Sequence, residues 1–355
     1  MLWLVLAASL VPVANGVQCM SGKGRPVDWF IVYKLPSLHG NQNHSDGHSD
    51  GDSVGQARAV HDSGHFYMDV NNPTWTFSNV HMTATNHAVY NTLQAIYQAK
   101  TTDDLAYVMY NDHTPSGKEP ESDGHSKGVF AFDKEEGFWL VHSTPRFPPN
   151  REDGYNFPPS GNYNGQSFLC VSYKYSQLKT IASQIVYNYV QVYDHMAPAS
   201  FLSDNPSLAA VIDHKRPEGA TASKRQLTSS QGTAFLSFAK TAAFNDDLYS
   251  GFVAPVLQSD LKTETWQDGR GKMRSNCSSS YKVYNVQAIS LPGGIHFKET
   301  KDHSKWAVSM TGTWVCIGDI NRQLHQLKRG GGTVCLQNKT VWSQFDNSIQ
   351  AFEKC

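Results

Sequence analysis

Two stretches of the sequence share one pattern: HSKGVFAFDKEEGFWLVHS at residues 125–143 and HSKWAVSMTGTWVCIGDIN at residues 303–321. Each begins with His-Ser-Lys, continues into an apolar run, turns through polar residues and ends a second apolar run on polar side chains. Two apolar runs of β-type residues joined by a short polar turn are typical of a β-hairpin. A tripeptide that recurs at the same place in two similar hairpins predicts two halves related by duplication, each supplying one His-x-Lys pair to a shared site.

The segments around the hairpins predict strands and helices that are interleaved along the chain, which favours an α/β fold of layered sheets and helices. The expected strands are 27–35, 105–110, 129–132, 138–141, 168–173, 283–291, 306–309 and 314–317. The spacing of apolar residues predicts helices over 89–100, 178–189 and 342–352. Polar or glycine-rich loops are expected at 41–53, 213–230 and 330–332.

The charge of the chain is nearly balanced at neutral pH. Its 355 residues include 30 Lys and Arg against 31 Asp and Glu, a formal net charge of −1. This balance excludes a constitutively basic nucleic-acid clamp and an acidic disordered tail as the main character of the protein. Protonation of all 15 histidines would change the net charge from −1 to +14, and histidine titrates near pH ~6.5. The composition therefore predicts a protein that becomes strongly cationic in an acidic compartment.

The amino terminus has the pattern of a secretory signal peptide. Residues 2–13 form an apolar run of suitable length, followed by small residues at the −3 and −1 positions of a cleavage site before Val17. We expect residues 1–16 to be removed and the mature chain to be soluble, with no membrane association and a lysosomal or secreted destination. Sequons that fit this route, or that are unused surface loops, occur at Asn43, Asn276 and Asn338.

The cysteines indicate disulfide bonds rather than a metal site. No two of them form a C-x-x-C pair, which excludes a zinc ribbon or a thioredoxin motif. An even number in a secreted chain predicts disulfides, although six cysteines allow about 15 pairings and the sequence does not choose among them. The six are Cys19, Cys170, Cys277, Cys316, Cys335 and Cys355.

The spacing within each motif has a chemical consequence. On a strand, residues i and i+2 point to the same face about 6.5–7 Å apart, so His125 converges with Lys127 while Ser126 faces away. His303 and Lys305 have the same relation. One neutral imidazole can then attack phosphorus, a protonated one can protonate the leaving oxygen, and the lysines can stabilise the non-bridging oxygens of a phosphodiester. We therefore expect neither a metal ion nor another cofactor. The simpler alternative is two solvated strand edges without a role in catalysis.

Polar residues near the hairpins are further candidates for the site. His142 and Asn321, at the ends of the second hairpin strands, are expected to bind substrate, and Asp133 and Asp319 to orient an imidazole or hold phosphate through a neighbour. Each of these residues has the alternative of a purely structural role at a strand end or turn. His44 and His48, in the 41–53 loop, could bind one metal ion together only if this segment were a helix. Its Gly and Asp content disfavours a helix.

These motifs resemble those of the deoxyribonuclease II family, and the resemblance runs along nearly the whole chain, from Val27 to Cys355. The matching stretches are 27–30, 32–36, 110–112, 125–129, 137–143, 246–251, 302–306 and 329–333. The resemblance implies a phospholipase D-like fold of two similar sheet-plus-helix halves, residues 17–195 and 196–355, with the active site at their junction. It also implies endonucleolytic cleavage of DNA at acidic pH without a metal ion, giving 3′-phosphate and 5′-hydroxyl ends.

The family pattern also assigns roles to individual residues. It implies catalytic histidines at His303 and His125, phosphate-binding lysines at Lys127 and Lys305, and glycosylation at Asn276. We expect His125 to be the nucleophile and His303 the general acid. The disulfides implied by the resemblance are Cys19–Cys170, Cys277–Cys355 and Cys316–Cys335.

An acid optimum is expected because clustered lysines should lower both histidine pKa values by like-charge repulsion, so that the charged acid persists only at low pH. A cationic surface would also capture DNA phosphates. One alternative is a lipid phosphodiesterase of the same fold, which needs an apolar membrane-facing rim, and no amphipathic basic helix in the sequence supplies one. Another is a non-catalytic secreted DNA-binding protein or toxin, for which loss of a motif residue is expected, whereas all four are present. The oligomeric state stays open.

Overall fold

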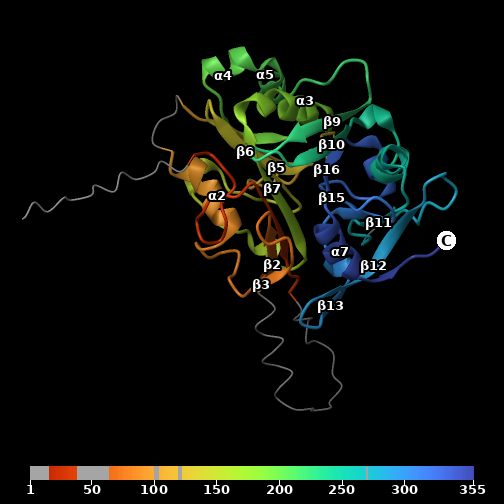
Figure 1. The fold of residues 1–355 in the computed structure, drawn as a ribbon. Helices are drawn as coiled ribbons and strands as arrows, with labels where there is room; N and C mark the ends of the chain where they lie inside the picture. The colour runs from red at the N-terminus through yellow and green to blue at the C-terminus, as the bar shows by residue number, and fades with distance from the viewer. Residues whose placement is uncertain (1–15, 38–63, 100–103, 119–121, 269–270) are drawn as a thin grey trace, which may run out of the picture.

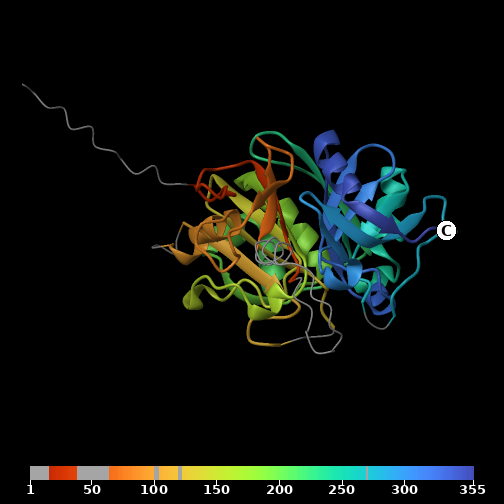
Figure 2. The ribbon, with the colours of Figure 1, turned by 90° about the horizontal axis from the view of Figure 1, so that it is seen from below.

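The computed structural model describes residues 16–37, 64–99, 104–118, 122–268 and 271–355. Residues 1–15 of the expected signal peptide, the 41–53 loop with its two histidines, and the Asn43 sequon lie outside these ranges. The described chain forms two large β-sheets that lie side by side, the first from the N-terminal half and the second from the C-terminal half (Figure 1). The two halves also stay on opposite sides when the molecule is seen from below (Figure 2).

The first sheet has eight strands in the order β3-β2-β1-β7-β6-β5-β4-β8. All its pairings are antiparallel. Its strands are β1 (Trp29–Lys34), β2 (His65–Asp69), β3 (Thr76–Ser78), β4 (Ala106–Asn111), β5 (Lys127–Phe132), β6 (Glu136–His142), β7 (Gln166–Lys174) and β8 (Val192–Met196). The sequence predicted β1 and β4 to β7, including the β5–β6 hairpin, whereas β2, β3 and β8 were missed.

The second sheet has nine strands in the order β13-β12-β11-β14-β15-β16-β10-β9, with β17 paired to β12. Only the β11–β12 pair is parallel among these described pairings. Its strands are β9 (Ala222–Thr228), β10 (Ala234–Lys240), β11 (Leu261–Glu264), β12 (Val283–Leu291), β13 (Ile295–Lys298), β14 (Trp306–Ser309), β15 (Trp314–Gly318), β16 (Gly331–Gln337) and β17 (Ile349–Phe352). The predicted hairpin 306–317 is β14–β15.

The centres of the two sheets have the same topology. The order β1-β7-β6-β5-β4 in the first sheet matches β10-β16-β15-β14-β11 in the second, and every neighbouring pair in both series is antiparallel. In both series the hairpin that follows a His-x-Lys motif lies between the same two neighbours. This shared order is what a duplicated unit predicts.

The strands alternate between two cores. On β1, Trp29, Ile31 and Tyr33 face a core shared with the second sheet, while Phe30 and Val32 face the core beneath a helix on the outer side. This period of two is the geometry of a strand buried on both faces. Burial of each large apolar side chain contributes about 1.5–3 kcal/mol, so the shared core fixes the two halves against each other.

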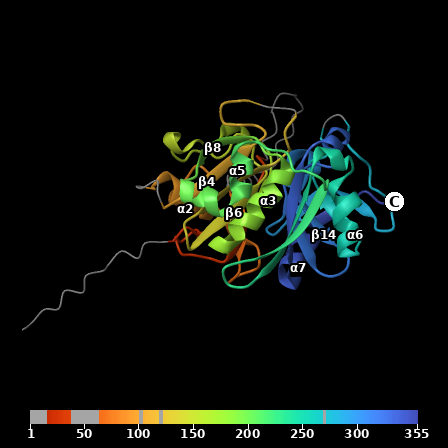
Figure 3. The ribbon, with the colours of Figure 1, turned by 90° about the horizontal axis from the view of Figure 1, so that it is seen from above.

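The helices cover the outer faces and fill the space between the sheets. Figure 3 shows α2 on the outer side of the first half, α6 on the outer side of the second, and α3 between the halves. The helices are α2 (Ala88–Tyr97), α3 (Leu178–Asn188), α4 (Ala199–Asp204), α5 (Pro206–Ile212), α6 (Ala254–Leu257) and α7 (Lys339–Asn347). None of the described helices has the length and apolar character required to cross a bilayer.

Three expected segments differ in the structure. The polar segment 213–230 contains β9, an edge strand whose exposed central residues hide its apolar period. The glycines at 330–332 lead into and begin the buried strand β16 rather than a loop; a Cβ on Gly332 would lie 2.5 Å from the Phe238 carbonyl oxygen on β10. The last helix ends at Asn347, and the apolar residues of 349–352 form β17.

Three disulfide bonds connect the pairs that the resemblance implied. Cys19–Cys170 ties the N-terminal segment to β7, Cys316–Cys335 links β15 to β16, and Cys277–Cys355 holds the C-terminus. The chain passes from the first sheet to the second between Met196, at the end of β8, and Ala222, at the start of β9.

Candidate active site

The two His-x-Lys motifs meet at the junction of the two halves. Residues 125–127 lead into β5, and residues 303–305 lead into β14. The backbone N–H of His125 donates to the carbonyl of Gly330, directly before β16, at 2.9 Å. The N–H of His303 donates to the carbonyl of Gly165, directly before β7, also at 2.9 Å. Each motif is thus anchored to the loop of the opposite half.

The charges of the two motifs act on each other. Burial is the largest cause of the lowered pKa of His125, and Lys305 from the other motif lowers it further. Burial likewise lowers the pKa of Lys305 to about 7, with Lys127 as the next cause. Because Coulomb interactions weaken with distance, these effects indicate that Lys305 lies near both His125 and Lys127. The sequence predicted lowered histidine pKa values from lysine repulsion; burial is the larger cause, since an imidazolium loses its hydration there.

A backbone carbonyl fixes the orientation of His125. Its Nδ1 lies 2.6 Å from the carbonyl oxygen of Asp319, directly after β15. A carbonyl oxygen only accepts hydrogen bonds, so Nδ1 carries the proton and Nε2 of the neutral ring holds the lone pair. The Nε2 atom lies 3.8 Å from Oδ2 of Asp112. His125 is therefore held in the tautomer that a nucleophile requires.

The buried carboxylate of Asp112, directly after β4, binds cations from both halves of the chain. It accepts hydrogen bonds from Lys127 Nζ and from Arg329 Nη2, the latter at 3.3 Å. Burial alone would raise its pKa, but His125, Lys127 and Arg329 hold the pKa well below its ordinary range. Asp112 belongs to a stretch that carried the family resemblance, but no role was predicted for it from the sequence. Its position directly after a buried strand was the available signal.

His303 has a different environment. Its Nε2 lies 3.0 Å from Nδ2 of Asn164, and its ring centroid lies 4.0 Å from that of Trp266. The strand register makes Trp266 the counterpart of Asp112, because β11 pairs with β14 as β4 pairs with β5. Burial, followed by Lys305 and other cations, lowers the pKa of His303 to about 2. The two halves thus offer a carboxylate to one histidine and an aromatic ring to the other.

Two buried lysines hold the loops that anchor the motifs, and neither was singled out from the sequence. Lys34, the last residue of β1, donates from Nζ to the carbonyls of Gly161, Asn162 and Asn164 at 2.6, 2.6 and 2.8 Å. Burial lowers its pKa to about 7. Its only sequence signal was a lysine at the end of an apolar strand, within a stretch that matched the family.

The counterpart in the second half is Lys240, the last residue of β10. Its Nζ donates to the carbonyls of Gln326, Leu327 and Arg329 at 3.1, 3.0 and 2.6 Å. Burial lowers its pKa to about 8. Each lysine therefore makes three hydrogen bonds to carbonyls of one loop. The glycine that directly follows this loop, Gly165 or Gly330, accepts the backbone N–H of a motif histidine.

The predicted substrate-binding residues are less accessible than expected. His142 is fully buried, and its ring packs against Phe147 and Phe168 at centroid distances of 5.4 and 5.7 Å. Asn321 is also buried, and its Oδ1 has no hydrogen-bond partner within the described chain. In this conformation neither side chain offers an open surface to a substrate.

Asp319 and Asp133, both predicted to orient an imidazole or hold phosphate, have different roles in the structure. Asp319 does orient an imidazole, through its backbone carbonyl, while its Oδ1 accepts from the N–H of Gly332 at 3.0 Å. Asp133 accepts from the backbone N–H groups of Glu135 and Glu136 at 2.8 and 2.7 Å and so stabilises the turn between β5 and β6. Its role in the structure is that of a turn residue.

The remaining candidate positions lie away from the junction. Asn338 caps α7, because its Oδ1 accepts from the N–H groups of Thr340 and Val341. Asn276 is half-buried, and its Oδ1 accepts from Ser279 Oγ at 3.1 Å. Across the described ranges, no three His, Cys, Asp or Glu side chains are grouped as ligands for a metal ion.

Comparison with known proteins relates this arrangement to one family. The family model described as Deoxyribonuclease II matches residues 18–355. The chain is 41% identical over 357 residues to Plancitoxin-1 of Acanthaster planci, covering 99% of this chain and 96% of that protein. It is 41% identical over 359 residues to Deoxyribonuclease-2-alpha of Rattus norvegicus (99% and 98%), and 37% over 367 residues to Cell death-related nuclease 6 of Caenorhabditis elegans (99% and 93%). The chain therefore belongs to the deoxyribonuclease II family.

Proposed function

We propose that this protein is an acid endodeoxyribonuclease with a phospholipase D-like fold, which hydrolyses DNA phosphodiesters without a metal ion and leaves 3′-phosphate and 5′-hydroxyl ends. Membership of the deoxyribonuclease II family supports the substrate and the reaction class. The matching order of the central strands supports a fold built from two similar halves. Three disulfides fit a lysosomal or secreted location, because such bonds persist in oxidising compartments.

One observation carries the proposal: the reciprocal anchoring of the two motifs. His125 is held by Gly330 of the second half, and His303 by Gly165 of the first. This exchange attaches each motif to a loop of the other half, which is the arrangement that a phosphate shared by two imidazoles and two ammonium groups would need. If each motif were an isolated, solvated strand edge, hydrogen bonds from both motif histidines to the opposite half would not be expected.

In the first step, His125 acts as the nucleophile. The lone pair of Nε2 attacks phosphorus, while Nδ1–H stays on the Asp319 carbonyl and stabilises the positive ring that forms. The bond from phosphorus to the 5′-oxygen breaks, and protonated His303 gives its proton to that oxygen. Lys127 and Lys305 stabilise the charge on the non-bridging oxygens. The products are a free 5′-hydroxyl and a 3′-phosphoryl group on His125.

In the second step, water hydrolyses this intermediate. Neutral His303 accepts a proton from the water, whose oxygen forms the new bond to phosphorus. The bond from phosphorus to Nε2 of His125 breaks, and the 3′-phosphate leaves. His303 has regained its proton and His125 its lone pair, so the site is ready for another cycle.

An acid optimum follows from the direction of the histidine pKa shifts. Burial and the surrounding lysines lower the pKa of His303 to about 2 in the protein without DNA, so its charged form is disfavoured at neutral pH. A bound phosphate is negative and favours the imidazolium. The general acid is therefore populated only when DNA is bound and the pH is low.

Plasmid nicking tests the proposal. We expect the wild-type protein to nick plasmid DNA at about pH 5 in the presence of EDTA and to lose this activity near pH 8. His125→Ala and His303→Ala should abolish nicking while acid-dependent DNA binding is retained, and His195→Ala, an exposed histidine on β8, serves as the matched control. A strict magnesium requirement, or unchanged nicking by both site variants, would contradict the proposal. DNA binding without any nicking by the wild type would favour the non-catalytic alternative.

A further inference from the structure

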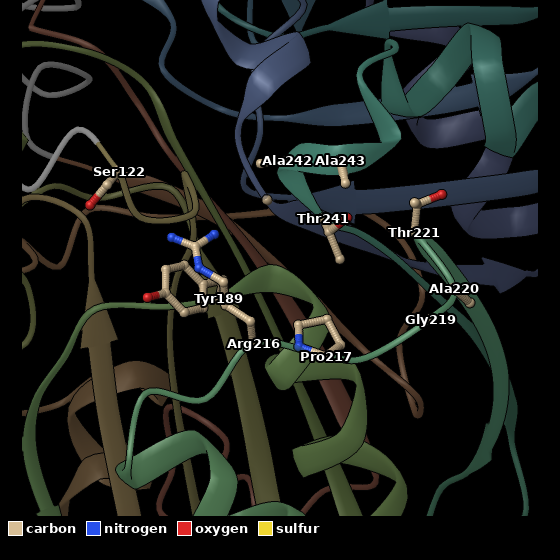
Figure 4. Close-up of a pocket in the computed structure, with 11 residues that line it drawn as sticks. Ser122, Tyr189, Arg216, Pro217, Gly219, Ala220, Thr221, Thr241, Ala242 and Ala243 are labelled. Carbon is tan, nitrogen blue, oxygen red and sulfur yellow. The ribbon is translucent and has the colours of Figure 1, made fainter.

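A pocket lies directly behind the loops that carry His125. Its volume is about 110 Å³, and it is bordered by the C-terminus of α3, the segment before β9 and the segment after β10. Figure 4 shows Arg216 and Tyr189 on one side of this pocket, with Thr221 and Thr241 on the other. The mechanism described above does not use any of these side chains.

The guanidinium of Arg216 is held in a fixed orientation. Its central carbon lies 3.9 Å from the ring centroid of Tyr189. The other partner of that ring is His214, stacked at 4.1 Å with an interplanar angle of 12°. A planar cation that packs on an aromatic ring loses less freedom when it binds an anion than a mobile one does. Arg216 is nevertheless exposed and makes no hydrogen bond or ion pair within the described part of the chain.

The stack is coupled to the backbone beside His125 by short contacts. The carbonyl of Tyr189 accepts from the N–H of Gly124 at 2.8 Å. Nε2 of His214 lies 3.4 Å from Oδ2 of the buried Asp123. Gly330, whose carbonyl receives the His125 N–H, itself lines the pocket. Gly330 therefore belongs both to the lining of the pocket and to the hydrogen bond that anchors His125.

The chemistry of the lining points to an anion. Arg216 supplies the only charged side chain among the described lining residues, and no carboxylate is among them. Of the acidic side chains next to the lining residues, Asp123 lies against His214 and Asp213 pairs with Lys215 at 3.2 Å, while Glu218 is not part of the lining. An oriented guanidinium with unused N–H donors matches the geometry of a phosphate.

We propose that Arg216, supported by Tyr189, binds a phosphate of the DNA strand that flanks the scissile phosphate. This inference rests on the proposed function for the identity of the strand, and Gly330, which lines the pocket and accepts from the N–H of His125, connects the pocket to that site. The subsite fixes the register of the strand, and it carries no base specificity, since phosphate contacts position nucleic acid without reading its sequence.

Salt-dependent DNA binding tests this subsite. Binding of a fluorescent duplex oligonucleotide at about pH 5 is measured between about 50 and 200 mM salt, with His303→Asn as the cleavage-defective background. Arg216→Gln is compared with Lys215→Gln, which removes the same charge from the neighbouring residue. One lost phosphate contact should make the slope of log K against log salt shallower by about 0.9, so that the affinity deficit of Arg216→Gln shrinks about 3.5-fold over this range. Lys215→Gln should leave the slope unchanged.

The outcomes separate this inference from the proposed function. Equal slopes for Arg216→Gln, Lys215→Gln and the background would overturn the phosphate subsite, even if the wild type nicks plasmid DNA. A wild type that does not nick DNA would overturn the proposed function, while a shallower slope confined to Arg216→Gln would still support the subsite. A loss of affinity for Arg216→Gln with an unchanged slope would also count against a phosphate contact.

Discussion

Replacement of Lys34 by methionine tests how the loop before β7 controls His303. Lys34 is buried at the end of β1, and its ammonium makes three hydrogen bonds to backbone carbonyls of residues 161–164. The next residue, Gly165, receives the N–H of His303, and the side chain of Asn164 contacts Nε2 of the same histidine. Lys34→Met retains the apolar stem and removes the donors.

The expected change in global stability is small because two contributions oppose each other. Burial lowers the pKa of Lys34 from its ordinary range to about 7. At about pH 5 the buried charge therefore costs about 4–5 kcal/mol, which methionine relieves. Each buried carbonyl left without a donor costs about 1–3 kcal/mol, and two of the three hydrogen bonds are only partly buried. The variant should therefore remain folded, with its defect confined to the loop.

The assay compares two substrates. One is DNA, whose 5′-oxygen needs a proton from His303 to leave; the other is thymidine 3′-(4-nitrophenyl phosphate), whose leaving group needs none. Displacement of His303 by about 1 Å should lower DNA cleavage by about 10²-fold and release of nitrophenolate far less. Lys34 also lowers the pKa of His303, so its removal should shift the loss of DNA cleavage to higher pH.

Lys240→Met is the matched control in the other half. It loosens the loop that holds the N–H of His125 through Gly330, so both substrates should be cleaved more slowly, to a similar extent. The reasoning fails if Lys34→Met slows both substrates equally and leaves the pH profile where it was.

Three other perturbations have defined outcomes. Burial lowers the pKa of His65 to about 4, so between pH 6.5 and 4 the unfolded chain binds a proton that the folded chain does not; urea unfolding should show that His65→Gln loses about 2 kcal/mol less stability than the wild type between pH 7 and 5. Asp112→Asn leaves Lys127 buried without its anion and should lower the unfolding free energy by about 3–5 kcal/mol, measured by chemical denaturation, with a stable variant as the contrary result. Removing the Cys19–Cys170 bond, with a sequence separation of 151, should destabilise by about 5 kcal/mol against about 3 kcal/mol for Cys316–Cys335, with a separation of 19, and the reverse order of melting temperatures would contradict this.

The repeat predicted the parts of the fold that depend on local pattern. The β5–β6 and β14–β15 hairpins have clear alternation and a polar turn between two apolar runs, so their strands were identified to within a few residues. The same pattern indicated a common site for the two motifs. The cross-half hydrogen bonds of His125 and His303 are consistent with that expectation.

Residues whose role depends on long-range contacts were not predictable in this way. The glycines that lead into β16 resemble a loop in sequence, but close approach of β10 excludes a side chain at Gly332. Lys34 and Asn164 act on His303 only because β1 and the loop before β7 reach the junction from distant parts of the chain. Trp266 becomes the counterpart of Asp112 only through strand register. No local period encodes any of these relations.

The central claim is that both motifs act on one phosphate, with His125 as the nucleophile and His303 as the acid. It is tested most directly by peptide mapping of His303→Asn after reaction with thymidine 3′-(4-nitrophenyl phosphate) and an alkaline quench. The account predicts a stoichiometric burst of nitrophenolate and a nucleoside 3′-phosphoryl group on His125, because the activated leaving group needs no acid while hydrolysis of the adduct needs His303. An adduct on another residue, or a burst that persists in His125→Asn, would contradict it.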